Sequence, residues 1–333
     1  MKKLLFSIAA VCGVLILAEA VCRFASPDSA DAPAYMRFTN PHRRQSGFIP
    51  DDALFWKLKP DNPVWEVNSK GFRGPEIPDK KADDEFRVIC AGDSCTFGLG
   101  AGGVPYEQTY PALVGKGLFP AIQAKSSENP LAKKHYNSFR ALNFGCPGYT
   151  SYQGLKLLES GIEWAKPDVI VAYFGINDGF EAVGYADKDQ RPVELADNPV
   201  KSLLLKSSLY SSFTRMILRS KQRANGGTPV ERVSMEDYHK NLGAIAELAK
   251  KHGAKAYFIA PPYLEADGSL NCETQRIHEP VIDVMPNLKE AAARGGPVIF
   301  PAPDNVHPTP AGHEAIAKAI VTRLADEIKR EKH

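Results

Sequence analysis

The sequence predicts an α/β protein with three layers, in which a five-stranded parallel sheet lies between two layers of helices. Two observations predict this class. From about residue 86 onward, short apolar runs alternate with longer segments of helical character, which is typical of a parallel sheet covered by helices on both faces. The chain is also 44% hydrophobic and 24% charged, close to the average of globular proteins, which excludes wholesale disorder.

The expected strands are short runs rich in apolar residues. They comprise residues 86–91, 140–144, 168–174, 254–260 and 297–300. Right-handed crossovers between parallel strands would bring the carboxyl end of every strand to one edge of the sheet, where proteins of this class bind their ligands. We therefore expect the chemistry immediately after the strands.

The expected helices cover about 108–118, 152–165, 235–252, 277–294 and 310–330. The third has Ser234 as its N-cap and ends at Gly253, as helix punctuation predicts. The fourth is expected to begin near Pro280, because proline is tolerated in a first turn. The last helix places apolar residues four apart on one face, namely Ile316, Ile320, Leu324 and Ile328.

The charge balance gives no indication of a nucleic-acid partner. The 333 residues include 41 Lys and Arg against 39 Asp and Glu, a formal net charge of +2, whereas nucleic-acid binders usually show a strong basic excess. The six cysteines are too few for a disulfide scaffold.

Residues 1–23 have the pattern of an export signal or membrane anchor. Lys2 and Lys3 precede an uncharged apolar run, residues 4–18, so the lysines would stay in the cytoplasm while the run enters the bilayer. The folded part is thus expected to be extracytoplasmic, either membrane-anchored or periplasmic or secreted. Both outcomes stay open, because Ala18-Glu19-Ala20 fits a cleavage site while the run through Cys22 is nearly long enough to span a membrane.

Residues 24–85 are expected to form an N-terminal extension and linker. Residues 24–50 are rich in Ser, Asp, Pro, Ala and Arg without a hydrophobic period, which is typical of a tether. Residues 55–74 contain scattered aromatics among Pro and Asn, so we expect short strands packed on the main domain. The main domain is expected to cover residues 86–330.

An insertion without a sheet-forming pattern interrupts this domain at about residues 180–232. Within it, residues 199–221 combine leucines and aromatics with lysines and arginines. Two interpretations stay open. The segment is either a lid or membrane-facing amphipathic helix that selects the substrate, or a helical hairpin that covers the sheet.

Residues suited to nucleophilic catalysis follow the strands. Ser94 lies in Gly92-Asp93-Ser94 after the first strand, on a tight turn where backbone N–H groups can face an anion. The second strand is followed by a turn with Gly145 and Gly148, and the third by Asn177, whose amide can donate a hydrogen bond. Each motif alone is also consistent with an ordinary turn or cap.

After the fifth strand, Asp304 and His307 stand three residues apart. This spacing lets the carboxylate reach one imidazole nitrogen while the other stays free to act as a base for a serine. Four separate strand ends therefore carry the residue types that acyl transfer requires.

This set resembles the SGNH, or GDSL, hydrolase superfamily over about residues 87–324, which implies a flavodoxin-like sandwich. The resemblance implies that Ser94 is the nucleophile, His307 the general base and Asp304 its partner. It further implies an oxyanion hole formed by the Ser94 N–H, the Gly148 N–H and the Asn177 side chain; the spacing around the glycines favours Gly148 over Gly145. Supporting roles in shaping the turns fall to two carboxylates, Asp93 and Asp178.

The activity implied is hydrolysis of carboxylic esters through an acyl-serine, on O-acetyl groups of envelope glycans or on acyl lipids. One alternative is an O-acyltransferase that uses the same triad to modify an envelope polysaccharide. A second is a non-catalytic module that binds carbohydrate. No metal or other cofactor is expected.

Other motifs carry less weight. Gly98-x-Gly100-x-x-Gly103 matches a dinucleotide fingerprint, but the Gly-Asp-Ser turn occupies its place after the strand. His313 is interpreted as a residue of the helix surface. Cys95 and Cys146 follow adjacent strands, so they either form a disulfide after export or remain two free thiols.

Overall fold

The computed structural model describes residues 2–25, 47–51, 53–100, 103–126, 136–182, 185–190 and 230–330, together with 207–210, 212–213, 216–217 and 220. The chain divides into two compact units. One comprises Met1–Lys57 with Phe180–Arg232, and the other Leu58–Gly179 with Val233–His333.

The larger unit is built on a parallel sheet of four strands in the order β4-β3-β5-β6. The strands are β3 (Glu85–Gly92), β4 (Ser138–Gly145), β5 (Val169–Tyr173) and β6 (Lys255–Phe258). All three pairings are parallel. Every residue of the interior strand β3 is buried, as expected of a strand covered on both faces.

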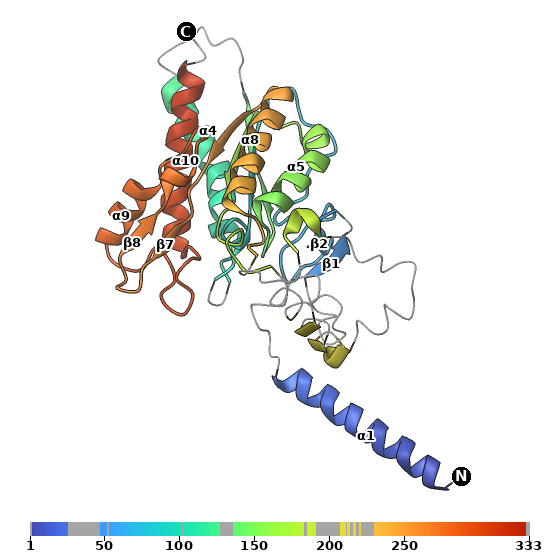
Figure 1. The fold of residues 1–333 in the computed structure, drawn as a ribbon. Coiled ribbons are helices and arrows are strands. Elements are labelled where there is room, and N and C mark those ends of the chain that lie inside the picture. The colour runs from blue at the N-terminus through green and yellow to red at the C-terminus, as the bar shows by residue number, and fades with distance from the viewer. Residues whose placement is uncertain are drawn as a thin grey trace. The chain divides into compact units, whose positions relative to one another are not determined.

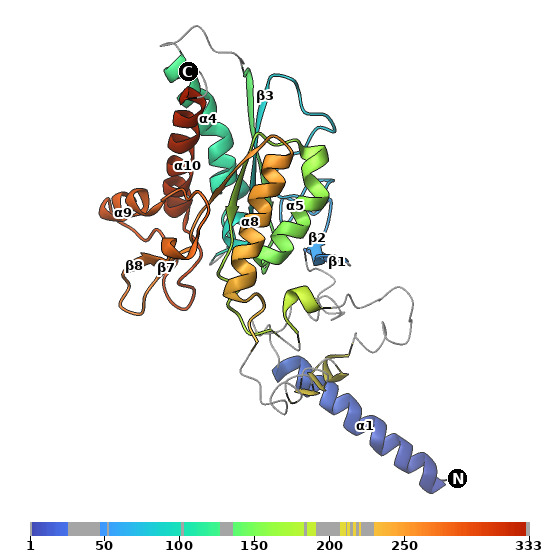
Figure 2. The same ribbon diagram turned by 45° about the horizontal axis from the view of Figure 1, so that its top comes forward.

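Helices cover both faces of this sheet. Helices α4 (Tyr110–Ser126) and α10 (Pro310–Arg330) pack together on one face, and α5 (Ser151–Ala165) and α8 (Met235–Lys251) pack together on the other, as Figures 1 and 2 show. Helix α9 (Met285–Ala293) lies against α10. The α/β architecture with three layers is therefore confirmed.

Smaller elements complete the description. They are α3 (Ser94–Phe97), the hairpin strands β7 (Pro262–Leu264) and β8 (Leu270–Cys272), and the 3-10 turns η2 (Tyr106–Gln108), η3 (Asp187–Asp189) and η4 (Thr274–Arg276).

The strand count differs from the prediction. Residues 297–300 do not join the sheet; Ile299 instead forms an isolated antiparallel bridge with Pro308. The backbone of this segment pairs with the loop that follows it, because Phe300 N donates to His307 O at 2.9 Å and Thr309 N donates to Val298 O at 3.0 Å. The sheet thus has four strands, and the expected fifth is part of a loop that folds back on itself.

The fourth predicted helix begins later than expected. Pro280 lies in extended backbone beside β6, where Phe258 N donates to Pro280 O at 2.9 Å and Ile282 N donates to Phe258 O at 2.8 Å. Through these bonds, residues 280–282 lie beside the edge strand β6 and form a single β-bridge with it, between Val281 and Phe258. Helix α9 therefore starts at Met285, after this edge is satisfied.

Within the larger unit, the segment before β3 packs on the sheet and its helices through aromatic rings. Phe72 stacks on Phe144 of β4 with ring centroids 4.0 Å apart, and it also contacts Trp164 of α5. Trp65 meets Phe97 of α3 edge to face at 5.4 Å. This segment thus packs on β4, on α5 and on α3, the short helix that begins at Ser94.

The smaller unit contains helix α1 (Lys2–Ala25) and the paired strands β1 (Phe48–Asp51) and β2 (Phe55–Leu58). In α1, the carboxylate of Glu19 accepts hydrogen bonds from Ser207 Oγ at 2.7 Å and from the N–H groups of Ser208 and Leu209 at 2.9 Å each. No helix in the described part of the chain has the length and hydropathy of a membrane span. Most of the amphipathic stretch at 199–221 lies outside the described residues.

Candidate active site

The register of the sheet brings three of the motif turns to one edge. Gly92, the last residue of β3, is paired with Gly145 at the end of β4 and with Tyr173 at the end of β5. The turns that contain Ser94, Gly148 and Asn177 therefore leave neighbouring strands at the same level, where ligands bind in sheets of this class.

The turn at Ser94 is shaped by its neighbours in sequence. A Cβ on Gly92 would lie 1.9 Å from Thr96 Oγ1 and 2.8 Å from the carbonyl oxygen of Tyr173, so this strand end requires glycine. Asp93 is the N-cap of α3 and accepts the Cys95 N–H at 2.8 Å. Gly98 ends the helix in the left-handed region with φ of 93°, and its N–H donates to Ser94 O.

Asp304 and His307 form the base arrangement that their spacing predicts. Asp304 Oδ1 accepts the backbone N–H of His307 at 2.9 Å, and the two carboxylate oxygens lie 2.8 and 2.9 Å from His307 Nδ1. His307 Nε2 lies 2.8 Å from Ser94 Oγ, although the two residues are 213 positions apart in sequence. The carboxylate thus orients the imidazole, and the other ring nitrogen faces the hydroxyl.

The loop that carries His307 is held on two sides. Its own backbone closes it through the Phe300–His307 bond, and the hairpin β7–β8 adds a bond from Leu264 N to Asn305 O at 2.8 Å. Asn305 adopts a positive φ of 66°, which asparagine tolerates better than most residues. These contacts fix the imidazole relative to the sheet edge.

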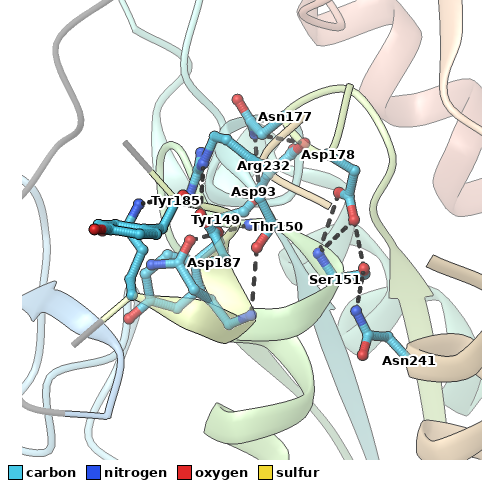
Figure 3. A network of polar contacts seen from close by, with 12 residues as sticks. Asp93, Tyr149, Thr150, Ser151, Asn177, Asp178, Tyr185, Asp187, Arg232 and Asn241 are labelled. Carbon is cyan, nitrogen blue, oxygen red and sulfur yellow. Dashed lines mark hydrogen bonds and ion pairs between the residues drawn. The ribbon is translucent and has the colours of Figure 1, made fainter. Parts of the chain in front are cut away.

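The turns after β4 and β5 are connected to each other. Gly148 has a φ of 82°, which favours glycine. Asp178 accepts the N–H of Ser151 at 3.1 Å and also the Ser151 hydroxyl, to which Asn241 Nδ2 donates at 2.9 Å (Figure 3). Asp178 therefore ties the turn that holds Gly148 and the start of α5 to the turn that holds Asn177.

The Asn177 side chain joins this network to the turn at Ser94. Its amide nitrogen donates to Tyr149 O at 3.0 Å and to Asp93 Oδ2 at 3.2 Å, as Figure 3 shows. Both amide hydrogens thus have an acceptor in this state. An anion arriving at Ser94 would share the amide with the Asp93 carboxylate.

Asp93 is fully buried, and its charge is therefore costly. Burial raises the pKa of its carboxyl to about 6, an effect opposed by the N–H of Cys95 and by His307. Because no solvent reaches this carboxylate, the hydrogen bonds that it accepts from Cys95 and Asn177 are important for keeping it ionised.

The sequence offered a disulfide between Cys95 and Cys146 as one of two alternatives, and the structure has the other. Both residues are buried free thiols. Cys95 Sγ points to the carbonyl oxygen of Val306 at 3.5 Å, and burial raises the pKa of its thiol far above the ordinary range. Cys95 is therefore a packing residue beside Ser94.

The interpretation of His313 as a surface residue is wrong. Its side chain is completely buried in α10, and its Nδ1 accepts the backbone N–H of Tyr110 at 3.2 Å. Burial lowers the pKa of His313 to about 3, so the imidazole is neutral at neutral pH.

Two residues to which the sequence analysis assigned no role support the site. Asn143 in β4 is buried, donates to Thr96 O at 3.0 Å and accepts the N–H of Gly145 at 2.9 Å. A polar residue within an otherwise apolar strand was the available signal. Gly145, in turn, allows close packing, since a Cβ there would lie 2.3 Å from the backbone nitrogen of Phe97.

Within the ranges that the structure describes, no three His, Cys, Asp or Glu side chains are grouped as metal ligands would be.

Several solved structures are similar to this chain at low identity. A lipase/acylhydrolase from Enterococcus faecalis is 19% identical, with a TM-score of 0.38, and the match covers 73% of this chain and 96% of that one. LAE5, an α/β hydrolase from the metagenome of Lake Arreo in Spain, is 17% identical with a TM-score of 0.42 and coverages of 72% and 94%. Axe2, an acetylxylan esterase from Geobacillus stearothermophilus, is 18% identical with a TM-score of 0.38 and coverages of 74% and 96%.

No curated protein matches the sequence. The model of the GDSL-like lipase/acylhydrolase family matches residues 90–315, a stretch that includes the turn at Ser94 and the loop of His307. Since this match spans well over half of the 333 residues, the chain belongs to the GDSL-like lipase/acylhydrolase family, whose members hydrolyse esters.

Proposed function

We propose that the protein hydrolyses carboxylic esters through an acyl-enzyme intermediate on Ser94. The observation that carries this proposal is the contact of 2.8 Å between Ser94 Oγ and His307 Nε2, with Asp304 bound to the opposite ring nitrogen. Acyl transfer to a serine needs a nucleophile that contacts a base, and a carboxylate that orients this base.

In the proposed first step, Ser94 Oγ attacks the ester carbonyl carbon while His307 Nε2 takes the hydroxyl proton. The negative charge on the carbonyl oxygen is stabilised by the N–H groups of Ser94 and Gly148 and by the Asn177 amide. When the intermediate collapses, the imidazolium gives its proton to the departing alcohol. Water then attacks the acyl-serine by the same route and releases the acid.

Replacing Ser94 with alanine tests the assignment. The variant should lose turnover of p-nitrophenyl acetate, while its circular dichroism and thermal unfolding match those of the unchanged protein. A fluorophosphonate should label the unchanged protein at Ser94, which peptide mass spectrometry would locate. Undiminished turnover, or labelling at another residue, would refute the role of Ser94.

We further propose that the substrate is an O-acetyl group of an envelope glycan or the acyl ester of a lipid. The apolar N-terminal run after Lys2 and Lys3 supports this, because it is the pattern of an exported protein. Turnover measured on p-nitrophenyl esters of increasing chain length, beside acetylated polysaccharides, separates the two substrates. Preference for short chains supports a deacetylase, and preference for long chains supports a lipid substrate.

An acyltransferase would use the same residues but pass the acyl group to a sugar hydroxyl. Incubation with an acyl donor and an acceptor glycan distinguishes the two reactions, because transfer adds the mass of the acyl group to the glycan, whereas hydrolysis releases the free acid from the donor and leaves the mass of the glycan unchanged.

The proposed location is extracytoplasmic, with the N-terminal helix retained as an anchor. The three hydrogen bonds that Glu19 accepts support retention, since cleavage beside Ala18 or Ala20 would detach or fray this helix. Mass spectrometry of the protein from a membrane fraction tests it. A peptide that begins at Met1 or Lys2 supports the anchor, and a mature N-terminus after residue 18 contradicts it.

A further inference from the structure

A buried arginine from the segment before the sheet reaches the turn at Ser94. Arg73 is only 7% exposed, and its backbone forms an isolated antiparallel β-bridge with Asn143 of β4. Its Nη1 donates to Phe97 O at 2.6 Å and to Gly98 O at 3.3 Å, and its Nη2 donates to Val104 O at 2.7 Å. The guanidinium also lies over the Phe97 ring, 4.6 Å from its centre.

Arg73 adds a charged donor to two carbonyl groups at the end of α3 that also accept uncharged donors: Asn143 Nδ2 lies 3.5 Å from Phe97 O, and Val104 N donates to Gly98 O at 3.0 Å. Helix α3 is a single turn, so its last carbonyls have no partner within the helix and carry the negative end of its dipole. A planar guanidinium donates in several directions at once, whereas an ammonium group is a single charged point. Gly98 makes the approach possible, because a Cβ there would lie 2.9 Å from Arg73 Nη1.

The same guanidinium binds the chain on both sides of the loop that follows the helix, at Gly98 and at Val104. Val104 N donates to Gly98 O at 3.0 Å, so Arg73 binds both ends of a loop that is already closed on itself. Glu66 completes the arrangement: it accepts from Arg73 Nη2 at 2.8 Å and from Tyr106 N at 3.0 Å. Arg73 and Glu66 thus hold the chain on both sides of this loop.

The loop meets the element that carries the base. A Cβ on Gly100 would lie 2.2 Å from the Phe300 ring, so the loop backbone packs directly on that ring. Phe300 N donates to His307 O at 2.9 Å. A displacement of the loop would therefore shift the positions of both Ser94 and His307.

We propose that Arg73 is a positioning residue for the nucleophile: it holds the backbone at Phe97, Gly98 and Val104 so that Ser94 Oγ stays within reach of His307 Nε2. The inference rests on the proposed role of Ser94. It also makes the segment before the sheet a part of the catalytic apparatus, although Arg73 touches neither the ester nor the reacting atoms.

The test compares Arg73 variants with a matched buried arginine. Arg87 is fully buried and binds Glu85 and Ala165 O at 2.7 and 2.8 Å, nearer the opposite end of β3. Arg73→Met should lower kcat for p-nitrophenyl acetate and the rate of phosphonylation by roughly 10- to 100-fold, with KM changed less than about threefold, because small misplacements of reacting groups have effects of this size. Arg73→Lys should have a kcat and a phosphonylation rate between those of Arg73→Met and the unchanged protein. Arg87→Lys should keep both rates of the unchanged protein, per folded molecule.

Chemical rescue separates positioning from loss of folding. Arg73→Ala with millimolar guanidinium chloride should regain a measurable part of kcat at a constant circular dichroism signal, and Arg87→Ala should not. The proposal is overturned if the unchanged protein is phosphonylated at Ser94 while Arg73→Met and Arg73→Lys react at the same rate. Failure of Ser94 labelling in the unchanged protein would instead refute the proposed function.

Discussion

The buried imidazole of His313 makes the stability of the fold depend on pH. Its pKa is lowered to about 3 by burial, whereas an unfolded histidine titrates near 6.5. Below 6.5 the unfolded chain therefore binds a proton that the folded protein does not accept until about pH 3. Stability from this group is fully present above pH 6.5 and is lost as the pH falls through the window between the two values.

The size of the effect follows from the shift. A difference of about 3.5 units corresponds to roughly 5 kcal/mol over the whole window, and to about 3 kcal/mol between pH 7 and pH 4. Asp93 acts in the opposite direction: its raised pKa of about 6 means that the folded protein takes up a proton first, which adds stability as the pH falls below 6. A variant that changes His313 alone separates the two contributions.

His313→Asn is that variant. An asparagine Oδ1 can take the place of Nδ1 and accept the N–H of Tyr110, but it does not titrate. The smaller side chain lowers the stability by a similar amount at every pH. Urea unfolding followed by tryptophan fluorescence at pH 7, 6, 5 and 4 should show the free energies of the two proteins converging by about 3 kcal/mol. Two curves that stay parallel within about 0.5 kcal/mol would refute the reasoning.

Three further outcomes are expected. Asp93→Asn keeps one acceptor oxygen where two donors, from Cys95 and Asn177, now bind, so kcat should fall by about 10- to 100-fold in steady-state assays, and an unchanged kcat would contradict the role of this carboxylate. Gly145→Ala places a Cβ 2.3 Å from Phe97 N, so it should lower the free energy of unfolding measured in urea by about 1–3 kcal/mol. Gly179→Ala is the control and should leave the stability nearly unchanged, because a Cβ there meets nothing within 4 Å. Equal stability of the two variants would count against the close packing of β4 on α3. Titration of the denatured protein should find the same number of thiols with and without reductant, because all six cysteines are free, and a rise after reduction would reveal a disulfide.

Much of the fold could be predicted because its signals are local. Helix α10 spans residues 310–330 as expected, and α8 follows its cap at Ser234. The strands of the sheet were recognisable as apolar runs since both of their faces are buried. The extended backbone at Pro280 and the loop at Phe300 could not be predicted in the same way, because their hydrogen-bond partners are set by the tertiary structure.

The same distinction holds at the candidate site. Ser94, Asn177, Asp304 and His307 lie in short motifs, so their residue types could be recognised in the sequence. Arg73 lies in a stretch without a recognisable motif. Only the tertiary packing of this stretch, such as that of Phe72 on Phe144, brings its guanidinium to the end of the turn at Ser94. His313 shares a helix with exposed residues, and its burial depends on how α10 meets α4.

The contact between Ser94 and His307 joins the first strand of the sheet to the loop before the last helix, across 213 positions of sequence. During synthesis, Ser94 emerges from the ribosome long before His307, and nearly the whole chain must emerge before the two side chains can come into contact. We therefore expect a chain truncated before residue 307 to lack esterase activity, because it lacks the imidazole that the proposed mechanism places beside Ser94.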